Sequence, residues 1–493
     1  MPAEPSGAGS APGPPADVTF DGRIAELKRL AEQGPPGDPE PFLKALSDAD
    51  PILRCVAAWG LGRLREPRAR RALEAGFIDP DPRVRALCAD ALAAIAHPGS
   101  FRVLVVALED GAGIVRAHAA SGLWALADAR ATRPLVNHVH DPVPEVRWNV
   151  AAALGRIPSP EATAGLSQML SDPHERVRRE AVLGLRHAVG QGVVDLVRPL
   201  LEDPSGRVRV AAAIVLGERR DLASVPHLLI AVTEDKTFVQ PAALVALGRI
   251  GDPVAVPTLV VRARGGPSWT RVCAVRALGE FNDEHALSAV RSSLADPAWS
   301  VRGAAAEAIG RIGSGEDLPR LMERIEDAHP WPRRSAIYAL GRLELSEAAP
   351  RIREELKHPS AEVRLAAIWT LGRLRDDGAR ELLIAYLRSL PSRHKPRTPV
   401  APDAAPGAPG LTSDAEDRQF DALVQSLGRL SEHNSDPMVL RALLDARARI
   451  REEEWERPAR LPPPEAERDE IIPTLRMLFE AALPGLAEEE GEI

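Results

Sequence analysis

The chain has few cysteines, few aromatic residues and no long hydrophobic run. Its three cysteines, Cys55, Cys88 and Cys273, are far apart and form neither a disulfide framework nor a metal-spaced pair, which is typical of a reducing compartment. No run approaches the ~18 apolar residues of a membrane helix. The first 15 residues lack the basic and apolar regions of a signal peptide. We therefore expect a cytoplasmic protein without a membrane span.

The chain also lacks an excess of positive charge and the common catalytic motifs. Its 62 basic residues stand against 70 acidic ones, so the net charge is −8 and no overall basic field attracts nucleic acid. There is no glycine-rich phosphate loop, nucleophile elbow or Cys-x-x-Cys. These absences disfavour nucleic acid as a partner and give no enzyme signature, and we expect no cofactor and no metal.

What the chain does have is a repeat with a period of 31 residues. An aliphatic residue follows the marker position by seven residues, and in most copies an aspartate precedes it by six. A period in this range indicates a solenoid of stacked helical units. The marker position is filled in turn by Arg54, Arg85, Arg116, Arg147, Arg178, Arg209, Gln240, Arg271, Arg302, Arg333 and Arg364.

Each unit is predicted to contain two helices with a proline-containing turn between them. In the second helix, a small residue three positions after the marker and the aliphatic residue four positions further on form the buried stripe. A glycine eight positions after the marker lets the helix end or approach its neighbour closely. The marker arginine faces away from the stripe and is expected to pair with the aspartate of its own or the adjacent unit. We predict these pairs to be exposed, worth ~0.2–1 kcal/mol each.

The predicted fold is an all-α, right-handed α-solenoid of about twelve helix pairs with capping helices. Two adjacent repeats depart from the pattern, one with Gln240 in place of the marker arginine and the next with Gly265 in place of the aspartate, which predicts a local change in curvature. The Pro-rich insertion could be a tether or a docking segment, and both readings stay open. The predicted parts are a disordered leader (1–16), the solenoid (17–390), the insertion (391–415), a final repeat with C-terminal capping helices (416–484) and an acidic tail (485–493).

The repeat resembles the HEAT-like repeat of the phycobilisome-lyase type. The similarity is carried by Val301-Arg302, Ala304-Ala305-Ala306 and Ala308-Ile309-Gly310. The resemblance implies that the second helices line a concave face and hold the binding residues. Deoxyhypusine hydroxylase, a di-iron enzyme built from similar repeats, uses several His-Glu pairs, whereas this chain offers only His174-Glu175. A lyase-like or metal-dependent oxidoreductase therefore remains the enzymatic alternative.

The rare aromatic residues gather at the positions that the packing leaves free. Several occupy one helical stripe within five successive units, and arginines at the same phase alternate with them. Tryptophan, tyrosine and arginine are favoured anchors of protein interfaces. The alternative is that the tryptophans only cover gaps between units. The predicted partner-binding residues are Phe238, Trp269, Arg276, Trp299, Trp331, Arg334, Tyr338, Arg342, Trp369 and Arg373.

The sequence thus predicts a non-enzymatic scaffold or adaptor that holds a protein or peptide in its concave groove. Nucleic-acid binding on the same face is a second alternative. Three glutamates on that face, Glu280, Glu307 and Glu362, argue against it, because phosphate contacts require a positive stripe. The pattern predicts neither the identity of the partner nor the oligomeric state.

Overall fold

The computed structural model describes residues 20–32, 34, 37–190, 192–234, 239–389 and 426. In this part of the chain the regular structure consists of 24 α-helices and short 3-10 turns, with no strand. The prediction of an all-α solenoid is confirmed. The predicted leader, insertion and acidic tail lie outside the described residues, and so does the predicted final repeat apart from Ser426.

The chain divides into two compact units, residues 1–252 (unit 1) and 253–493 (unit 2). An N-terminal helix, α1 (Phe20–Glu32), precedes the first pair. The first helices of the pairs are α2 (Glu40–Ala45), α4 (Arg70–Ala75), α6 (Phe101–Ala107), α8 (Thr132–Val136), α10 (Pro160–Met169), α12 (Val193–Val197), α14 (Val225–Glu234), α16 (Val256–Arg264), α18 (Glu284–Ser293), α20 (Leu318–Ile325), α22 (Ala349–Glu354) and α24 (Arg380–Ser389). The second helices are α3 (Pro51–Leu64), α5 (Pro82–Ile95), α7 (Gly113–Leu126), α9 (Pro144–Leu154), α11 (Glu175–Gly184), α13 (Gly206–Glu218), α15 (Val239–Ile250), α17 (Ser268–Leu278), α19 (Trp299–Ile312), α21 (Pro330–Arg342) and α23 (Ala361–Arg373).

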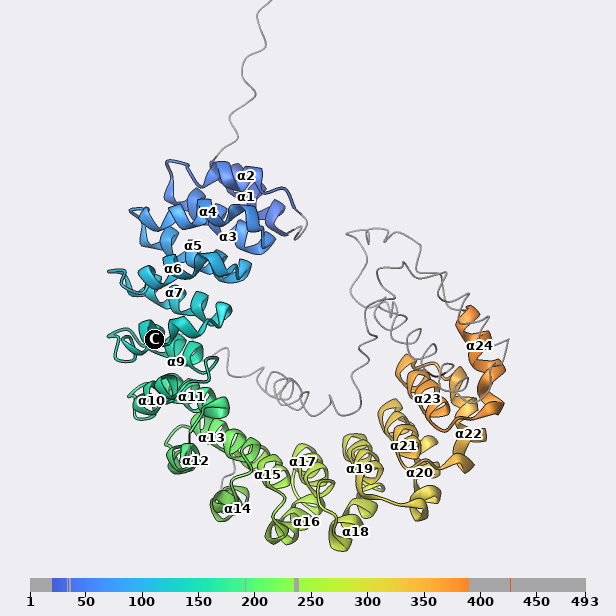
Figure 1. Cartoon of the computed structure of the whole chain (residues 1–493). Coiled ribbons are helices and arrows are strands. Elements are labelled where there is room, and N and C mark those ends of the chain that lie inside the picture. The colour runs from blue at the N-terminus through green and yellow to red at the C-terminus, as the bar shows by residue number, and fades with distance from the viewer. Residues whose placement is uncertain are drawn as a thin grey trace, which may run out of the picture. The chain divides into compact units, whose positions relative to one another are not determined.

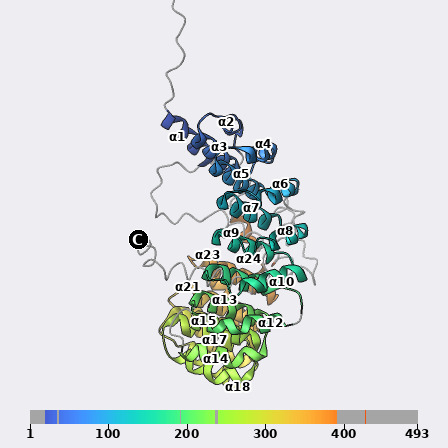
Figure 2. The same ribbon diagram turned by 90° about the vertical axis from the view of Figure 1, so that its left-hand side faces the viewer.

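Within each unit the helices form two layers, one of first helices and one of second helices. In unit 1, α3, α5, α7 and α9 stand in one column and α4, α6 and α8 in the other (Figure 2). In unit 2, α17, α19, α21 and α23 form one layer and α16, α18, α20 and α22 the other (Figure 1). Neighbouring second helices contact each other, as α19 does α21 and α5 does α7. None of the helices in the described ranges is both long and apolar enough to cross a bilayer.

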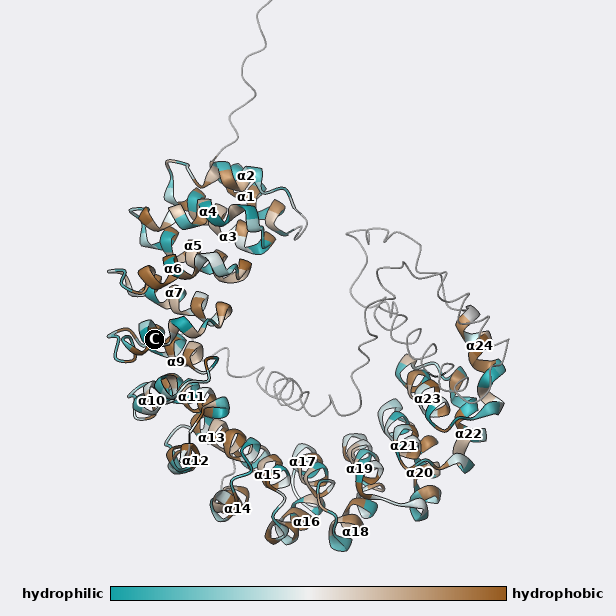
Figure 3. Cartoon of the chain, in the orientation of Figure 1, coloured by the Kyte–Doolittle hydropathy of each residue, from teal (hydrophilic) through white to brown (hydrophobic). Residues whose placement is uncertain are grey.

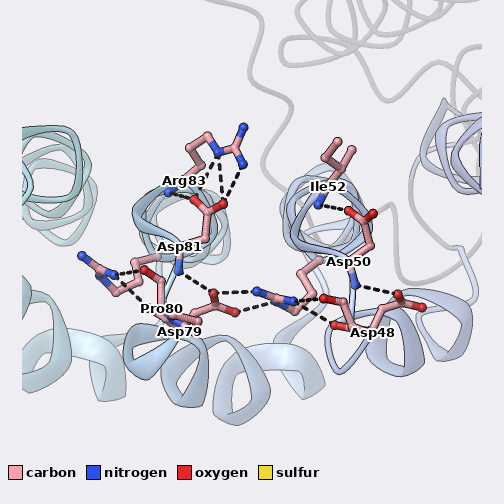
Figure 4. A network of polar contacts seen from close by, with 10 residues as sticks. Asp48, Asp50, Ile52, Asp79, Pro80, Asp81 and Arg83 are labelled. Atoms are coloured by element: carbon pink, nitrogen blue, oxygen red, sulfur yellow. Dashed lines mark hydrogen bonds and ion pairs between the residues drawn. The ribbon is translucent and has the colours of Figure 1, made fainter.

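Aspartate followed by proline starts two of the second helices of unit 1, α3 and α5. The Asp50 carboxylate accepts a hydrogen bond from the backbone N–H of Ile52 at 2.7 Å, and Pro51 occupies the first turn. Asp81 caps the next second helix in the same way, through the N–H of Arg83 at 2.8 Å. Figure 4 shows both caps. Such a cap satisfies an N–H that has no partner within the helix, while proline has none to satisfy. The Asp-Pro turns of the sequence therefore fix where these helices begin.

The predicted buried stripe forms the core of both units. Each helix carries hydrophobic and hydrophilic residues side by side (Figure 3). The eleven aliphatic residues seven positions after the marker, from Leu61 to Leu371, are at most 1% exposed. The eleven small residues three positions after the marker, from Ala57 to Ala367, are fully buried. Small side chains in this row let the helices lie close together.

The repeated glycine serves close approach between second helices. A Cβ atom at Gly310 would lie 2.9 Å from the Cα of Ala339, and one at Gly62 would lie 2.9 Å from the Cα of Ala91. Neither glycine has a positive φ. Both roles predicted for this glycine are seen, since α9 and α17 end with Gly155 and Gly279 as their C-cap residues. Several helices end instead at a non-glycine residue in the left-handed conformation, such as Ala127 at φ 48°.

The marker arginines link each helix-pair repeat to the next repeat along the chain. In unit 1, Nε and Nη2 of Arg54 donate to the two carboxylate oxygens of Asp79 in the following helix-pair repeat, at 2.6 and 2.9 Å. Its Nη1 donates to the backbone carbonyl of Asp48 at the start of its own unit, at 2.9 Å. Figure 4 shows Asp48 and Asp79, the acceptors at the two successive turns. The same two-sided contact recurs for Arg85, Arg116, Arg147, Arg178 and Arg302.

The prediction that these pairs are exposed is wrong. The side chains of Arg116 and Asp141 are only 13% and 4% exposed. The pair is buried because the turns of two adjacent helix-pair repeats pack around it. All three guanidinium nitrogens of Arg116 donate to acceptors in these turns. Hydrogen bonds from Arg85 lower the pKa of Asp110 below its ordinary value, against the effect of burial. This series of Arg–Asp pairs, which we call the Arg–Asp ladder, is therefore part of the packed interface between successive helix-pair repeats.

Ser426 continues the helix contacts of the solenoid beyond the insertion. Its hydroxyl donates to the carbonyl of Ile368 at 2.9 Å, as the hydroxyl of Thr370 donates to Ile337 at 3.0 Å. These partners are 58 and 33 residues apart, a difference of 25. Ser426 thus takes the place of Thr370 one unit later, with 25 extra residues in between. The final repeat predicted over 416–484 stays a prediction, and this contact agrees with its register.

Candidate protein-binding surface

The predicted binding residues of unit 2 lie on the exposed side of its second helices. We call this surface the second-helix face of unit 2, formed by α17, α19, α21 and α23. It is the inner side of the row that these helices follow (Figure 1). Positions two before, one after, five after and nine after the marker point away from the fully buried stripe. The side chains of Arg276, Arg334 and Arg373 are 25%, 27% and 39% exposed, so they can reach a partner.

One aromatic cluster lies at the N-terminal ends of α19 and α21. Trp299, which is 46% exposed, stacks on His329 with ring centroids 4.0 Å apart and planes 9° apart. Trp331 meets Trp299 edge to face at 5.5 Å and 82°. The Trp331 ring also covers Gly303, where a Cβ atom would come within 2.8 Å of it. Glycine at this position therefore lets the indole lie flat on α19.

Arg276 extends this cluster toward α17. Its guanidinium carbon is 5.7 Å from the Trp331 ring centroid, and it forms an ion pair with Glu307 at 3.3 Å. The Ser335 hydroxyl donates to the other oxygen of Glu307 at 3.2 Å. Three successive second helices thus share one connected group of aromatic and charged side chains. A cation beside a ring face adds ~0.5–1 kcal/mol at an exposed site.

A second aromatic cluster joins α21 and α23. Tyr338 and Trp369 meet edge to face, with centroids 5.4 Å apart and planes at 71°. Arg373 lies over Trp369 at 5.6 Å and donates through Nε to the carbonyl of Gly341 at 2.8 Å. That bond satisfies a carbonyl near the end of α21, whose partial negative charge favours a cation. The contacts hold the indole and the guanidinium in place at the surface.

The remaining predicted residues are less closely connected. Arg334 pairs with Glu362 of the next unit at 3.0 Å. The Cδ atom of Arg342 would be 3.5 Å from a Cβ atom at Gly310, so the Arg342 side chain lies against α19. Trp269 is half-buried at the start of α17. Phe238 lies outside the described residues. Burial lowers the pKa of Arg311 between these helices; Glu280 and Glu307 oppose this effect, while Arg342 and Arg276 add to it.

The repeat unit and its helices identify the family. A family model described as HEAT repeats matches residues 39–113, 102–186, 193–272, 262–340 and 318–393, which together cover more than half of the chain. The chain belongs to the HEAT-repeat family. Its Arg–Asp ladder and second-helix face are therefore features of a HEAT solenoid.

Solved HEAT solenoids share this fold at low sequence identity. Yeast importin-beta (Kap95p) matches with a TM-score of 0.56 at 14% identity, over 88% of this chain and 68% of its own. Kap95p in a structure with RanGDP matches with a TM-score of 0.53 at 14% identity, over 89% of this chain and 68% of its own. YibA from Escherichia coli is 20% identical over 55% of this chain and 98% of its own, with a TM-score of 0.41. No curated protein sequence matches the chain. At 14% identity, the likeness to the two Kap95p structures shows the fold alone.

Two members of the aromatic clusters escaped the sequence reasoning. His329 lies two residues before Trp331, outside the helical stripe that was searched, yet its ring stacks on Trp299. Gly303, on which the Trp331 ring lies, is not among the predicted binding residues. A signal did exist, since His174 occupies the same turn position and lies 5.5 Å from Trp148. Searching the capping residue of each second helix for aromatic rings would have found His329.

The described residues hold no group of three or more His, Cys, Asp or Glu side chains suited to a metal ion. His174 caps α11 through its Nδ1, which accepts from the N–H of Arg176 at 3.2 Å. The neighbouring Glu175 accepts a hydrogen bond from Ser205. These two side chains thus have structural partners in the turn.

Proposed function

We propose that the chain is a non-enzymatic adaptor that binds a protein or peptide on the second-helix face of unit 2. The observation that carries the proposal is the pair of aromatic clusters, Trp299–His329–Trp331 and Tyr338–Trp369. Each is partly exposed, and each lies beside an arginine that internal contacts hold in place. Rigid aromatic and arginine side chains lose little conformational entropy on binding, which favours them as anchors.

A HEAT solenoid can hold a protein partner, since yeast Kap95p has been solved as a complex with Nup1. That likeness concerns the fold and does not carry Nup1 or any other partner over to this chain. The finer resemblance to the phycobilisome-lyase type of repeat stays a prediction, as does the cytoplasmic location. The mixed charge of the face, with Arg276 beside Glu307 and Arg334 beside Glu362, suits a polypeptide better than a phosphate backbone.

Capture of partners by the purified full chain tests the proposal. A double variant, Trp331→Ala/Trp369→Ala, removes one anchor from each cluster and should lose the bound protein. The matched control is Trp124→Ala in unit 1, which removes a tryptophan that is 43% exposed and lies 4.7 Å from the guanidinium of Arg156. Circular dichroism establishes that both variants stay folded.

The result expected is loss of one specific partner from the double variant and its retention by the control. Recovery of the same proteins by all three chains contradicts the assignment of this face. Recovery of nucleic acid, released by moderate salt, would favour the nucleic-acid alternative instead. Residue-level proof would come from crosslinking the partner to unit 2 and mapping the linked peptides.

A further inference from the structure

Unit 1 carries a pocket of different chemistry on its own second-helix layer. It has a volume of about 220 Å³ and is lined by Glu175, Arg176, Arg179 and Arg207. The first three come from the start of α11, and Arg207 comes from the start of α13. Three of the four lining side chains are therefore cationic.

Arg176 is positioned by a ring and keeps its donors free. Its guanidinium carbon is 4.1 Å from the centroid of the Trp148 ring on α9. A cation–π contact uses no N–H group, so the donors of the guanidinium remain available. Among the described residues, the Arg176 side chain has no hydrogen bond or ion pair. It thus stands ready for an anion at the rim of the pocket.

The other two arginines are oriented by carboxylates. Nη1 of Arg207 is 3.5 Å from Oε1 of Glu175, whose other oxygen accepts from the Ser205 hydroxyl. Arg179 pairs with its sequence neighbour Glu180. Three guanidinium groups thus face two carboxylates, and the balance is positive. The N-termini of α11 and α13 add a further positive potential at the same place.

We propose that this pocket binds the phosphate group of a phosphorylated serine or threonine in a partner protein. A phosphate monoester carries nearly two negative charges and three acceptor oxygens, which donors from two helices can engage from different sides. A carboxylate has two oxygens, and one arginine fork satisfies both. Glu175 opposes the bound anion while it orients Arg207. The proposal is independent of the second-helix face of unit 2.

Binding of peptide libraries to the full chain tests this proposal. The probes are fluorescein-labelled heptapeptides of degenerate sequence with a fixed central phosphoserine, and matched libraries with serine or glutamate in its place. We expect the phosphoserine library to bind at least about tenfold more tightly than either control library, because serine lacks the charge and glutamate lacks the second charge and third acceptor oxygen of the phosphate. Fluorescence anisotropy measures the affinities at fixed salt.

Variants of the lining residues should move the affinity in opposite directions. Arg176→Ala and Arg207→Ala should each weaken binding of the phosphoserine library about tenfold, through loss of a charged hydrogen bond. Glu175→Gln should strengthen it, since the amide oxygen can still accept from Ser205 while the negative charge is gone. The matched control is Arg83→Ala, two residues before its marker like Arg176 and Arg207, with a side chain 62% exposed and bound to Asp81.

Several results would overturn the assignment. Equal binding of the serine library would show that the phosphate is not recognised, and equal binding of the glutamate library would assign the pocket to a carboxylate. Competition by inorganic phosphate as strong as by the phosphopeptides would point to the free ion. Weaker binding by Glu175→Gln, or equal loss with Arg83→Ala, would also contradict it. The Trp331→Ala/Trp369→Ala variant should bind the library normally, which separates this proposal from the function proposed for unit 2.

Discussion

Unit 1 and unit 2 are built from the same helix pair but treat the Arg–Asp ladder differently. In unit 1, five successive arginines from Arg54 to Arg178 donate to an aspartate 25 residues ahead. In unit 2 this pairing ends after Arg302. Arg333 then reaches Glu355, and Arg364 donates to the hydroxyl of Tyr386 at 2.8 Å. Each of these arginines still donates to the backbone carbonyl six residues before it. The common requirement is therefore an acceptor for the guanidinium. Aspartate meets it throughout Arg54 to Arg178 and again at Arg271 and Arg302, whereas Glu355 and Tyr386 meet it for Arg333 and Arg364.

The surroundings of the tryptophans on the second helices also differ between unit 1 and unit 2. In unit 1, Trp59, Trp124 and Trp148 each lie beside one arginine, at 6.0, 4.7 and 4.1 Å. In unit 2, Trp299, Trp331 and Trp369 each meet a second tryptophan or a tyrosine ring, whereas Trp148 in unit 1 meets the imidazole ring of His174. The exposed side chains of this layer lie outside the buried stripe, so they can differ between unit 1 and unit 2 without loss of the core. The comparison shows that the ladder and core preserve the architecture, while the exposed layer gives each unit its own chemistry.

The largest expected effect tests whether the two cores are equivalent. Leu123 in unit 1 and Leu340 in unit 2 are both fully buried. Leu123→Ala and Leu340→Ala should each lower the free energy of unfolding by about 2–5 kcal/mol, since each leaves a cavity. Urea unfolding measures the loss, and hydrogen exchange locates it. Leu222→Ala, at a position 63% exposed, is the control. A small loss at only one of the two leucines would show that the units are packed differently.

The next effect tests the two kinds of rung. Arg116→Ala leaves the Asp141 carboxylate buried without its partner and should cost about 2–3 kcal/mol of unfolding free energy. Arg364→Ala leaves only the neutral Tyr386 hydroxyl and should cost about 1 kcal/mol. Chemical denaturation of both variants measures the difference. Equal losses would mean that the backbone hydrogen bonds, common to both rungs, carry the stability.

Acid should weaken the ladder of unit 1 more than the last rung of unit 2. Hydrogen bonds from Arg85 keep the pKa of Asp110 below its ordinary value in the folded state. A lowered folded-state pKa adds stability above the unfolded pKa of about 3.9, and this stability is lost as pH falls below it. Asp110→Asn should therefore lower stability at neutral pH and flatten its decline below about pH 4. Arg364→Ala should leave that decline unchanged. Urea midpoints measured across the acid range check both expectations.

The smallest expected effect concerns a feature common to both units, the left-handed residues that end helices. Ala127 in unit 1 and Glu344 in unit 2 have φ values of 48° and 56°. Ala127→Gly and Glu344→Gly should each raise the unfolding free energy by about 1 kcal/mol, because glycine adopts this conformation without strain. Ala125→Gly, inside α7, should lower it by about 0.5–1 kcal/mol. Thermal unfolding followed by circular dichroism resolves the opposite signs. A loss at Ala127 would show that its methyl group makes a contact worth more than the strain.

Much of the architecture was predictable because the repeat has a fixed period. The positions of Ala305 and Ile309 relative to Arg302 are enough to identify a buried face, and both residues are fully buried. The spacing leaves two possible partners for each marker arginine, the aspartate of its own repeat and that of the adjacent repeat. It does not decide between them, and the prediction that the Arg–Asp pairs are exposed is wrong. Periodicity fixes which side of a helix a residue occupies, whereas the burial of a turn depends on how closely the next unit approaches.

The candidate surface was predictable only in part. The stripe containing Trp331, Tyr338 and Trp369 follows from helical spacing, and these side chains remain partly exposed. The stacking of His329 on Trp299 joins residues 30 positions apart in two successive helix-pair repeats of unit 2. Helical spacing within one unit does not describe contacts between the ends of two helices. The arginine pocket of unit 1 likewise joins the starts of two helices, α11 and α13, which helical spacing does not relate.

By itself, the sequence determined the helix pair, its 31-residue period and the row of small and aliphatic residues that make the core. These follow from local preferences and from the burial of apolar surface, which are written into each unit. Only the tertiary structure decided that each arginine reaches forward to the next aspartate, that Trp331 lies on Gly303, and that three arginines line one pocket. Such contacts depend on the offset between stacked helices, and that offset is set by the packing of many side chains together.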